Sequence, residues 1–209
     1  MTTFPDDVAS PIDLRDPADA LDWEQTAMVK RPWRADFFVR FSEALGGVSP
    51  PVQRVLELGS GPGFLAEHLL STHPALKAVL LDFSTPMHAL ARARLGPLAS
   101  RAEFVTRSFK DPDWAESLGL FDAVVTNQTV HELRHKRHAA GLHAQVRSLL
   151  RPGAIYLVAD HHCGDGGMTN NDLFMTVAEQ HEALLDAGFT RVDGLLQHGG
   201  MVLHAARMA

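Results

Sequence analysis

The stretch that decides the fold is residues 54–65, RVLELGSGPGFL. Its apolar residues up to Leu58 are typical of a short buried strand, and the residues from Phe64 onward follow a helical pattern. Three glycines lie between strand and helix at alternate positions, namely Gly59, Gly61 and Gly63. Glycine permits positive φ and lets a ligand approach the backbone, while a helix start offers unpaired N–H groups. The stretch therefore predicts a strand, a tight turn and a helix that together cradle a ligand.

The spacing of these glycines distinguishes between classes of ligand. A dinucleotide-binding turn follows G-x-G-x-x-G, and Phe64 stands where its last glycine would be. Glu57 precedes the first glycine by two residues, and the resulting order E-x-G-x-G-x-G resembles motif I of the class I S-adenosylmethionine-dependent methyltransferases. The resemblance implies a turn packed against the amino-acid part of the cofactor. The implied cofactor-binding residues are Glu57, Gly59, Ser60, Gly61, Gly63 and Phe64. An ordinary glycine-rich turn is the alternative.

Composition restricts the class of protein. The 209 residues are 45% hydrophobic and 21% charged, which is typical of a globular domain with a substantial core. The net charge of −6 argues against general nucleic-acid binding, and the one cysteine, Cys163, excludes an intramolecular disulfide and a cysteine-rich zinc site. The chain starts without a basic or apolar leader and has no run of 18 apolar residues, so we expect a cytoplasmic protein with no membrane partner.

The N-terminal part is expected to cover the core. Residues 1–19 are rich in Asp and Pro and predict an irregular lead-in, and residues 20–48 predict two helices with a break near Pro32. The aromatic side chains of this region, Trp23 and Trp33 among them, either fill the core or line a site. The predicted organisation is a lead-in at 1–19 and a single methyltransferase domain at 20–209, with a Rossmann-like core at 52–208.

A second signal is an acid that ends an apolar run at residues 77–84, KAVLLDFS. In a doubly wound sheet this strand places Asp82 beside the glycine turn. The resemblance implies that Asp82 binds the hydroxyls of the cofactor ribose, and it places Phe83 and Met87 in the same site. The alternative is that Asp82 is an N-cap or turn acid at the start of the helix that begins near residues 84–86.

The third predicted strand, at residues 101–107, lacks an expected acid at its end. Members of the methyltransferase family that this sequence resembles often hold the adenine amino group with a carboxylate at this place. Ser108 and Phe109 stand there instead, so we expect one of them, or the backbone, to contact adenine.

The fourth predicted strand, within residues 120–133, carries the residues expected nearest the reaction. The segment resembles the fourth strand of the same methyltransferase family. The resemblance places Asn127 and Gln128, which follow the strand, beside the amino-acid part of the cofactor, and it places His131 beside the substrate. Histidine is the natural base at neutral pH, so His131 is a candidate general base, with a purely structural role as the alternative. His161 and His162 follow the fifth strand and are further catalytic candidates.

A metal site is the competing interpretation of the histidines. Residues 131–135, HELRH, match the letters of the zinc-protease motif H-E-x-x-H, and residues 134–150 predict one helix that carries His135 and His138. The cations of the run 134–138, RHKRH, oppose metal binding, and the stretch directly follows a buried strand. We therefore expect no metal and no nucleic acid, and treat the basic run as a solvated helix start.

The rest of the chain completes the pattern. A strand at 154–160, a helix at 173–188 and two strands at 191–196 and 201–206 predict a doubly wound, Rossmann-like α/β fold with seven mostly parallel strands and one antiparallel strand near the end. The resemblance implies transfer of a methyl group from S-adenosylmethionine to an O or N atom of a small-molecule metabolite or natural-product intermediate. The alternatives are a non-catalytic S-adenosylmethionine-binding protein and, less favoured by Phe64, a nicotinamide-dependent reductase. A homodimer is compatible with the sequence.

Overall fold

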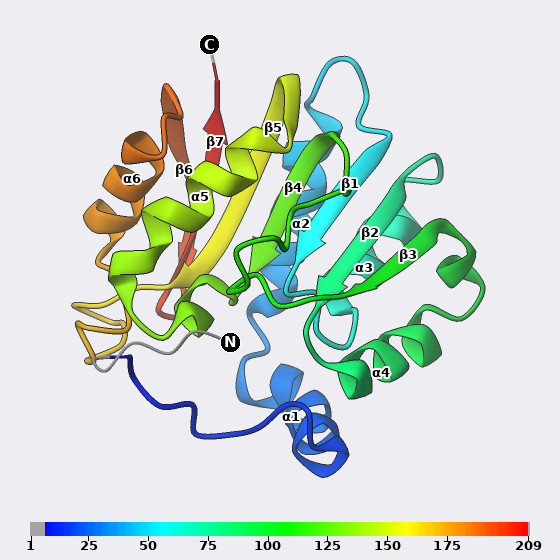
Figure 1. The fold of residues 1–209 in the computed structure, drawn as a ribbon, viewed down its shortest axis with the longest axis horizontal. Coiled ribbons are helices and arrows are strands. Elements are labelled where there is room, and N and C mark those ends of the chain that lie inside the picture. The colour runs from blue at the N-terminus through cyan, green and yellow to red at the C-terminus, as the bar shows by residue number, and fades with distance from the viewer. Residues whose placement is uncertain (1–6, 209) are drawn as a thin grey trace.

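Seven strands form one twisted sheet in the computed structural model, which describes residues 7–208 (Figure 1). The strand order is β3-β2-β1-β4-β5-β7-β6, and β7 alone runs in the direction opposite to the other strands of the sheet. This arrangement confirms the predicted fold class. The chain crosses over after β3 and starts β4 on the other side of β1. The strands are β1 (Arg54–Leu58), β2 (Lys77–Asp82), β3 (Ala102–Thr106), β4 (Phe121–Asn127), β5 (Leu150–His161), β6 (Arg191–His198) and β7 (Met201–Arg207).

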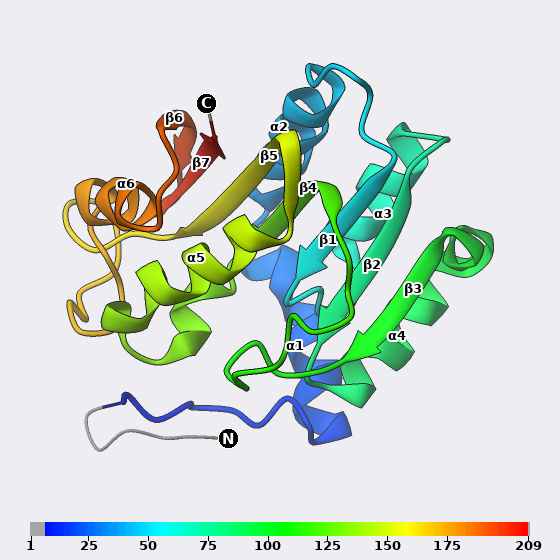
Figure 2. The same ribbon diagram turned by 45° about the horizontal axis from the view of Figure 1, so that its top comes forward.

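Helices cover both faces of the sheet (Figure 2). The α-helices are α1 (Pro17–Lys30), α2 (Arg34–Gly46), α3 (Phe64–Thr72), α4 (Thr85–Leu95), α5 (Ala139–Ser148) and α6 (Val177–Asp186). Successive residues of a strand face opposite layers, so Val55 packs with α2 and α3 whereas Leu56 packs with α5 and α6. Both residues are buried, because a parallel sheet covered on two faces exposes neither side to water. Helix α1 lies beyond the carboxyl ends of the strands (Figure 1).

The helix predicted at residues 134–150 is wrong over its first turns. Two short 3₁₀ turns, η2 (Val130–Leu133) and η3 (Lys136–His138), precede α5, and Arg134 between them has a left-handed φ of 70°. The His135 side chain accepts a hydrogen bond from the Arg137 N–H, which holds a local turn in place of an α-helical start. His131 and His135 therefore lie in separate turns and do not share a helix face.

Two other boundaries differ from those predicted. Strand β5 starts at Leu150 and continues through Pro152-Gly153, with a register shift against β4 between Phe121 and Ala123. Helix α6 begins at Val177, after a capping box in which Thr176 and Glu179 each satisfy the backbone N–H of the other. The third 3₁₀ turn, η1 (Gly96–Arg101), joins α4 to β3.

Candidate active site

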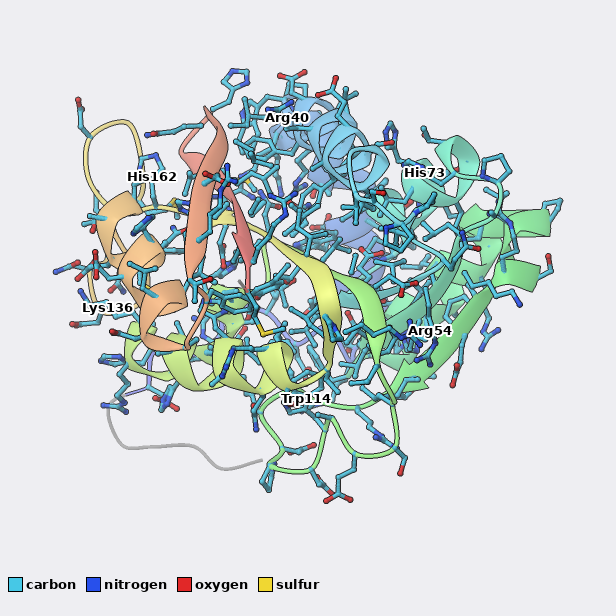
Figure 3. The ribbon with its side chains drawn as sticks, turned by 90° about the horizontal axis from the view of Figure 1, so that it is seen from above. Arg40, Arg54, His73, Trp114, Lys136 and His162 are labelled. Atoms are coloured by element: carbon cyan, nitrogen blue, oxygen red, sulfur yellow. The ribbon has the colours of Figure 1, made fainter. Side chains whose placement is uncertain are left out.

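A cavity of about 310 Å³ lies at the carboxyl ends of β1, β2 and β4, where doubly wound sheets bind ligands. Most of the residues predicted for the site line it. They are Glu57, Gly59, Ser60, Gly61, Phe64, Asp82, Phe83, Met87, Phe109, Asn127, Gln128, His131 and His161. Gly63, Ser108 and His162 do not line it: Gly63 starts α3, Ser108 lines the adjoining cavity, and His162 faces Gln197 of β6. Figure 3 shows His162 on the α6 side of the molecule.

The glycine turn is shaped by close packing on one side and open space on the other. Gly59 has a φ of 68°, and a Cβ there would lie 2.2 Å from the Thr129 side chain, so only glycine fits. Gly61 has a φ of 52°, and no described atom lies within 4 Å of the place where its Cβ would be. The backbone at Gly61 is therefore open to a ligand, while Thr129 holds the turn from behind. No sequence pattern indicated that Thr129 packs on this turn.

Asp82 ties the end of β2 to this turn. Its two carboxylate oxygens accept hydrogen bonds from the Gly61 N–H (2.8 Å) and the Ser84 N–H (2.9 Å). The side-chain cap of α4 is Ser84, whose Oγ accepts from the Met87 N–H, so Asp82 is not the cap. Its bond to the Ser84 N–H, two residues on, is nevertheless that of a turn acid. Burial raises the pKa of Asp82 against the lowering effect of the backbone N–H groups, and burial together with Asp82 raises that of Glu57 well above its usual value.

Three residues that line the cavity each have a buried side-chain oxygen with no hydrogen-bond partner among the described residues. These oxygens are Glu57 Oε2, Ser60 Oγ and Asn127 Oδ1. A buried polar atom without a partner costs about 1–3 kcal/mol, so such atoms are uncommon in native proteins. Their convergence on one cavity fits a polar ligand that supplies the missing partners.

His131 and Asp160 form a buried pair on the other side of the cavity. His131 Nδ1 lies 2.6 Å from Asp160 Oδ1, and the His131 backbone N–H donates to Asp160 Oδ2 at 2.8 Å. His131 Nε2 lies 3.3 Å from Glu132 Oε1. Burial alone would lower the pKa of His131, but the adjacent Asp160 and Glu132 carboxylates raise it to about 10. His131 therefore carries a proton at neutral pH, and Asp160 holds its orientation.

His161 has the opposite electrostatic character. Burial lowers the pKa of His161 to about 4, and the positive charges of His131, Arg31 and Arg34 add to the lowering. Its ring packs against Phe174, with the centroids 5.9 Å apart, and Phe174 also packs on His131 at 5.4 Å. At neutral pH the cavity thus presents a charged and a neutral imidazole beside one aromatic ring. The sequence pattern did not indicate Phe174.

The N-terminal helices supply side chains that sequence reasoning missed. Trp23, Arg31, Arg34 and Phe38 line the cavity, so the interpretation of Trp23 as a site residue holds, whereas Trp33 packs over Gly199. The side chain of Arg34 donates to Gln128 Oε1 (2.6 Å) and to the Ala27 carbonyl (2.5 Å), and its guanidinium lies 5.1 Å from the Trp23 ring. A tryptophan beside arginines at a helix break was the available signal.

Residues 7–15, the N-terminal strap, cross this end of the molecule below the sheet (Figure 2). Arg134 holds the strap, because its side chain donates to the Val8 carbonyl (2.8 Å) and the Ala9 carbonyl (2.6 Å). Residues 10–12 and 14 of the strap line the cavity, and the whole strap borders an adjoining cavity of about 1030 Å³. Residues 7–16 of the predicted lead-in are thus irregular, as expected, but residues 17–19 already belong to α1, and the strap forms a wall of the site.

The described residues contain no cluster of three or more His, Cys, Asp and Glu side chains placed to hold a metal ion. Residues 7–208 also include no helix long and apolar enough to cross a membrane.

Comparison with known proteins agrees with this geometry. Residues 55–153 match a family described as a methyltransferase domain. The matched stretch contains the glycine turn, Asp82, Asn127 and His131. These matches support a class I S-adenosylmethionine-dependent methyltransferase. S-adenosylmethionine is the cofactor that such a methyltransferase uses.

The chain is also similar to curated relatives and to solved structures. A malonyl-[acyl-carrier protein] O-methyltransferase of Legionella pneumophila is 31% identical over 115 residues, which are 53% of this chain and 36% of the relative. An O-methyltransferase family protein from Burkholderia thailandensis has a TM-score of 0.74 at 20% identity, covering 94% of this chain and 61% of that one. Human N-acetylserotonin methyltransferase in complex with S-adenosylmethionine has a TM-score of 0.71 at 17% identity, covering 93% and 57%. The structural likenesses show the shared fold, and the chain spans about a third of the length of the curated relatives it matches.

Proposed function

We propose that this protein transfers a methyl group from S-adenosylmethionine to an oxygen atom of a small molecule. The observation that carries the proposal is a set of three cavity-lining residues beside an open glycine turn, each with a buried side-chain oxygen that no described residue satisfies. They are Glu57, Ser60 and Asn127. The names of the relatives support oxygen as the acceptor atom, because two matching curated proteins are O-methyltransferases.

The residues at the ends of β1 and β2 fit the nucleoside and amino-acid parts of the cofactor. Asp82 has lone pairs left after its two backbone bonds and would accept the ribose hydroxyls. The backbone at Gly61, together with the Ser60 and Asn127 side chains, would hold the amino-acid part. Phe109 is largely buried and lines the same cavity, and we propose that its ring flanks the adenine.

When bound, the cofactor supplies a methyl group already activated on a sulfonium centre, so the protein need not activate the methyl carbon itself. The work left to the chain is to bind the acceptor, orient its oxygen and keep water out. Phe38, Phe174 and Leu173 give that part of the cavity apolar walls, and the strap closes its side. These features suit a small organic acceptor.

We propose that His131 acts as a charged hydrogen-bond donor to the acceptor. Asp160 holds Nδ1, so the donor would be the Nε2–H, which lies 3.3 Å from Glu132 Oε1 and would turn from Glu132 to the acceptor. A general base must be unprotonated at the working pH, and the pKa of His131 is raised to about 10 by its carboxylate neighbours. Asp160 is the positioning residue, because it binds both the ring and the backbone N–H of His131. An acceptor oxygen that is already ionised needs no base, and an imidazolium beside it would favour its binding.

The test is product formation with a labelled methyl donor. The purified protein is incubated with S-adenosylmethionine carrying a labelled methyl group and with sets of phenols, alcohols, carboxylic acids and amines. We expect label in an oxygen-methylated product and release of S-adenosylhomocysteine. Tight binding of S-adenosylhomocysteine with no transfer to any acceptor would support the non-catalytic binding protein instead.

A further inference from the structure

Arg31 is a cation inside the site that the fold does not use. It ends α1 at the junction with α2, lines the cavity and is half-buried. No hydrogen bond or ion pair joins its side chain to any residue in the described part of the chain. Burial lowers the pKa of Arg31, but an arginine remains protonated at neutral pH. A partly desolvated charge without a partner costs stability, so its presence in a cavity points to a ligand of opposite charge.

The two neighbouring arginines of the cavity show the contrast. Arg34 is bound to Gln128 and to the Ala27 carbonyl, and Arg134 is bound to carbonyls of the strap. Both therefore hold elements of the fold in place. Arg31 has all five N–H donors available, in the planar fork that matches a carboxylate in two parallel hydrogen bonds.

The position of Arg31 assigns it to the acceptor. Its charge lowers the pKa of His161, after burial and the charge of His131, more strongly than Arg34 does. Arg31 and His161 line the same cavity, and the His161 ring lies 5.5 Å from that of His131, whereas the acids Glu57 and Asp82 lie at the ends of β1 and β2. Phe38 and Phe174 line the same cavity, so that it combines apolar side chains with the charge of Arg31.

We propose that Arg31 binds a carboxylate of the acceptor, so that the substrate is a small organic acid. This inference rests on the proposed function and names the substrate class of the same site. The cofactor also carries a carboxylate, and the shared cavity of Arg31 with the paired rings of His131 and His161 favours the acceptor's. Arg31 is then a specificity-determining residue that touches the substrate and has no part in the fold.

Binding measurements separate these cases. Calorimetry measures the affinity for S-adenosylhomocysteine of wild type, Arg31→Gln, Arg31→Lys and the control Lys30→Gln, which removes the same charge from an exposed neighbour. Protein saturated with S-adenosylhomocysteine is then titrated with matched pairs of acids and amides: 4-hydroxybenzoate with 4-hydroxybenzamide, phenylacetate with phenylacetamide, and malonate with malonamate.

Wild type and Lys30→Gln are expected to bind at least one acid about tenfold or more tightly than its amide, because a hydrogen-bonded charge pair contributes about that much. Arg31→Gln is expected to lose this preference, Arg31→Lys to keep part of it, and all variants to bind S-adenosylhomocysteine within about twofold of wild type. An acid preference that survives in Arg31→Gln, or its absence from wild type for every pair, would overturn the inference. So would a loss of S-adenosylhomocysteine affinity in Arg31→Gln, which would assign Arg31 to the cofactor. Failure of wild type to bind S-adenosylhomocysteine would instead count against the proposed function.

Discussion

Single polar residues decide what this site can bind. The sheet and its helices bury Glu57, Ser60 and Asn127 with side-chain atoms that no described residue satisfies, and they bury Asp82 against the glycine turn. Packing alone would favour apolar side chains at these places, since a buried polar atom costs free energy unless it is paired. The residues therefore indicate a polar ligand more directly than the fold does.

Asp82→Asn tests the ribose assignment. The variant keeps the shape of the side chain but replaces one acceptor oxygen with a donor, so the affinity for S-adenosylhomocysteine should fall by about 10- to 100-fold. Calorimetric titration measures the affinity, and a melting curve checks that the turn at Gly61 still folds. Asp193→Asn, at an exposed ion pair with Arg191, is the control and should bind normally. Affinity in Asp82→Asn equal to that of the control would remove Asp82 from the site.

The protonation of His131 distinguishes a charged donor from a base. Because its folded pKa is raised to about 10, the donor role predicts a rate that is level around neutral pH and falls as the pH rises through about 10. A base would give a rate that rises over the same range. Asp160→Asn removes the main charge that raises the pKa, so the fall should move to lower pH.

An NMR titration of the His131 ring in the absence of substrate gives this pKa directly, without any dependence on activity. A His131 that titrates near the ordinary histidine value of about 6.5 would contradict the charged-donor role and return the base to consideration.

The N-terminal strap is the element that the sequence describes least well. Its Asp- and Pro-rich composition correctly predicts irregular backbone, yet nothing in the composition predicts that it lies across the cavity. The contact depends on Arg134, whose left-handed backbone and side chain reach the strap from a turn predicted as helix. Hydrophobic periodicity reports burial along one element, and it carries no information on a polar contact between residues more than a hundred positions apart.

Arg134→Ala tests whether the strap closes the site. Loss of the hydrogen bonds to the Val8 and Ala9 carbonyls should increase hydrogen exchange across the strap and speed the dissociation of S-adenosylhomocysteine several-fold, with a small change in melting temperature. Stopped-flow dissociation and exchange mass spectrometry measure the two effects. Arg191→Ala, whose ion pair is exposed, is the matched control. Unchanged exchange at residues 8–14 would show that Arg134 does not hold the strap.

Features that depend on one segment of the chain were predicted from the sequence, whereas features that depend on contacts between distant segments were not. Strands with a near-continuous apolar run, such as β2 and β4, were predicted within a few residues, as was the glycine turn between β1 and α3. Asp82 was predicted at the site because parallel strands end at the same edge, and Asn127 and His131 because they match the pattern of the resembling family. Thr129, Phe174 and Arg31 were missed, since their roles follow from packing between distant segments.

On the scale of the whole molecule, neutral histidines buried in the fold make it sensitive to acid. Burial lowers the pKa of each of His143, His161 and His204 to about 4. The unfolded chain binds protons at these groups below about pH 6.5 while the folded chain does not, so each contributes a loss of about 1.4 kcal/mol per pH unit between 6.5 and 4. His131 acts in the opposite sense above pH 6.5, because its folded pKa is raised to about 10, so stability should be greatest near pH 6.5.

Urea denaturation between pH 7.5 and 4.5 measures this loss. His143→Phe should flatten the dependence, because it removes one of the titrating groups while it fills a similar apolar volume beside Tyr156. His135→Phe, at a side chain outside the core, should leave the slope as in wild type. A free energy of unfolding that stays constant from pH 6.5 to 4.5 would show that these histidines titrate normally in the folded protein.

The most direct test of the central claim is calorimetric titration of the purified protein with S-adenosylhomocysteine, with NADH as the comparison ligand. The account predicts binding of one S-adenosylhomocysteine per chain with a dissociation constant on the order of micromolar, and no measurable binding of NADH. Binding of NADH in preference to S-adenosylhomocysteine, or of neither, would contradict the assignment of the cavity at Glu57, Gly61 and Asp82 to a methyl donor.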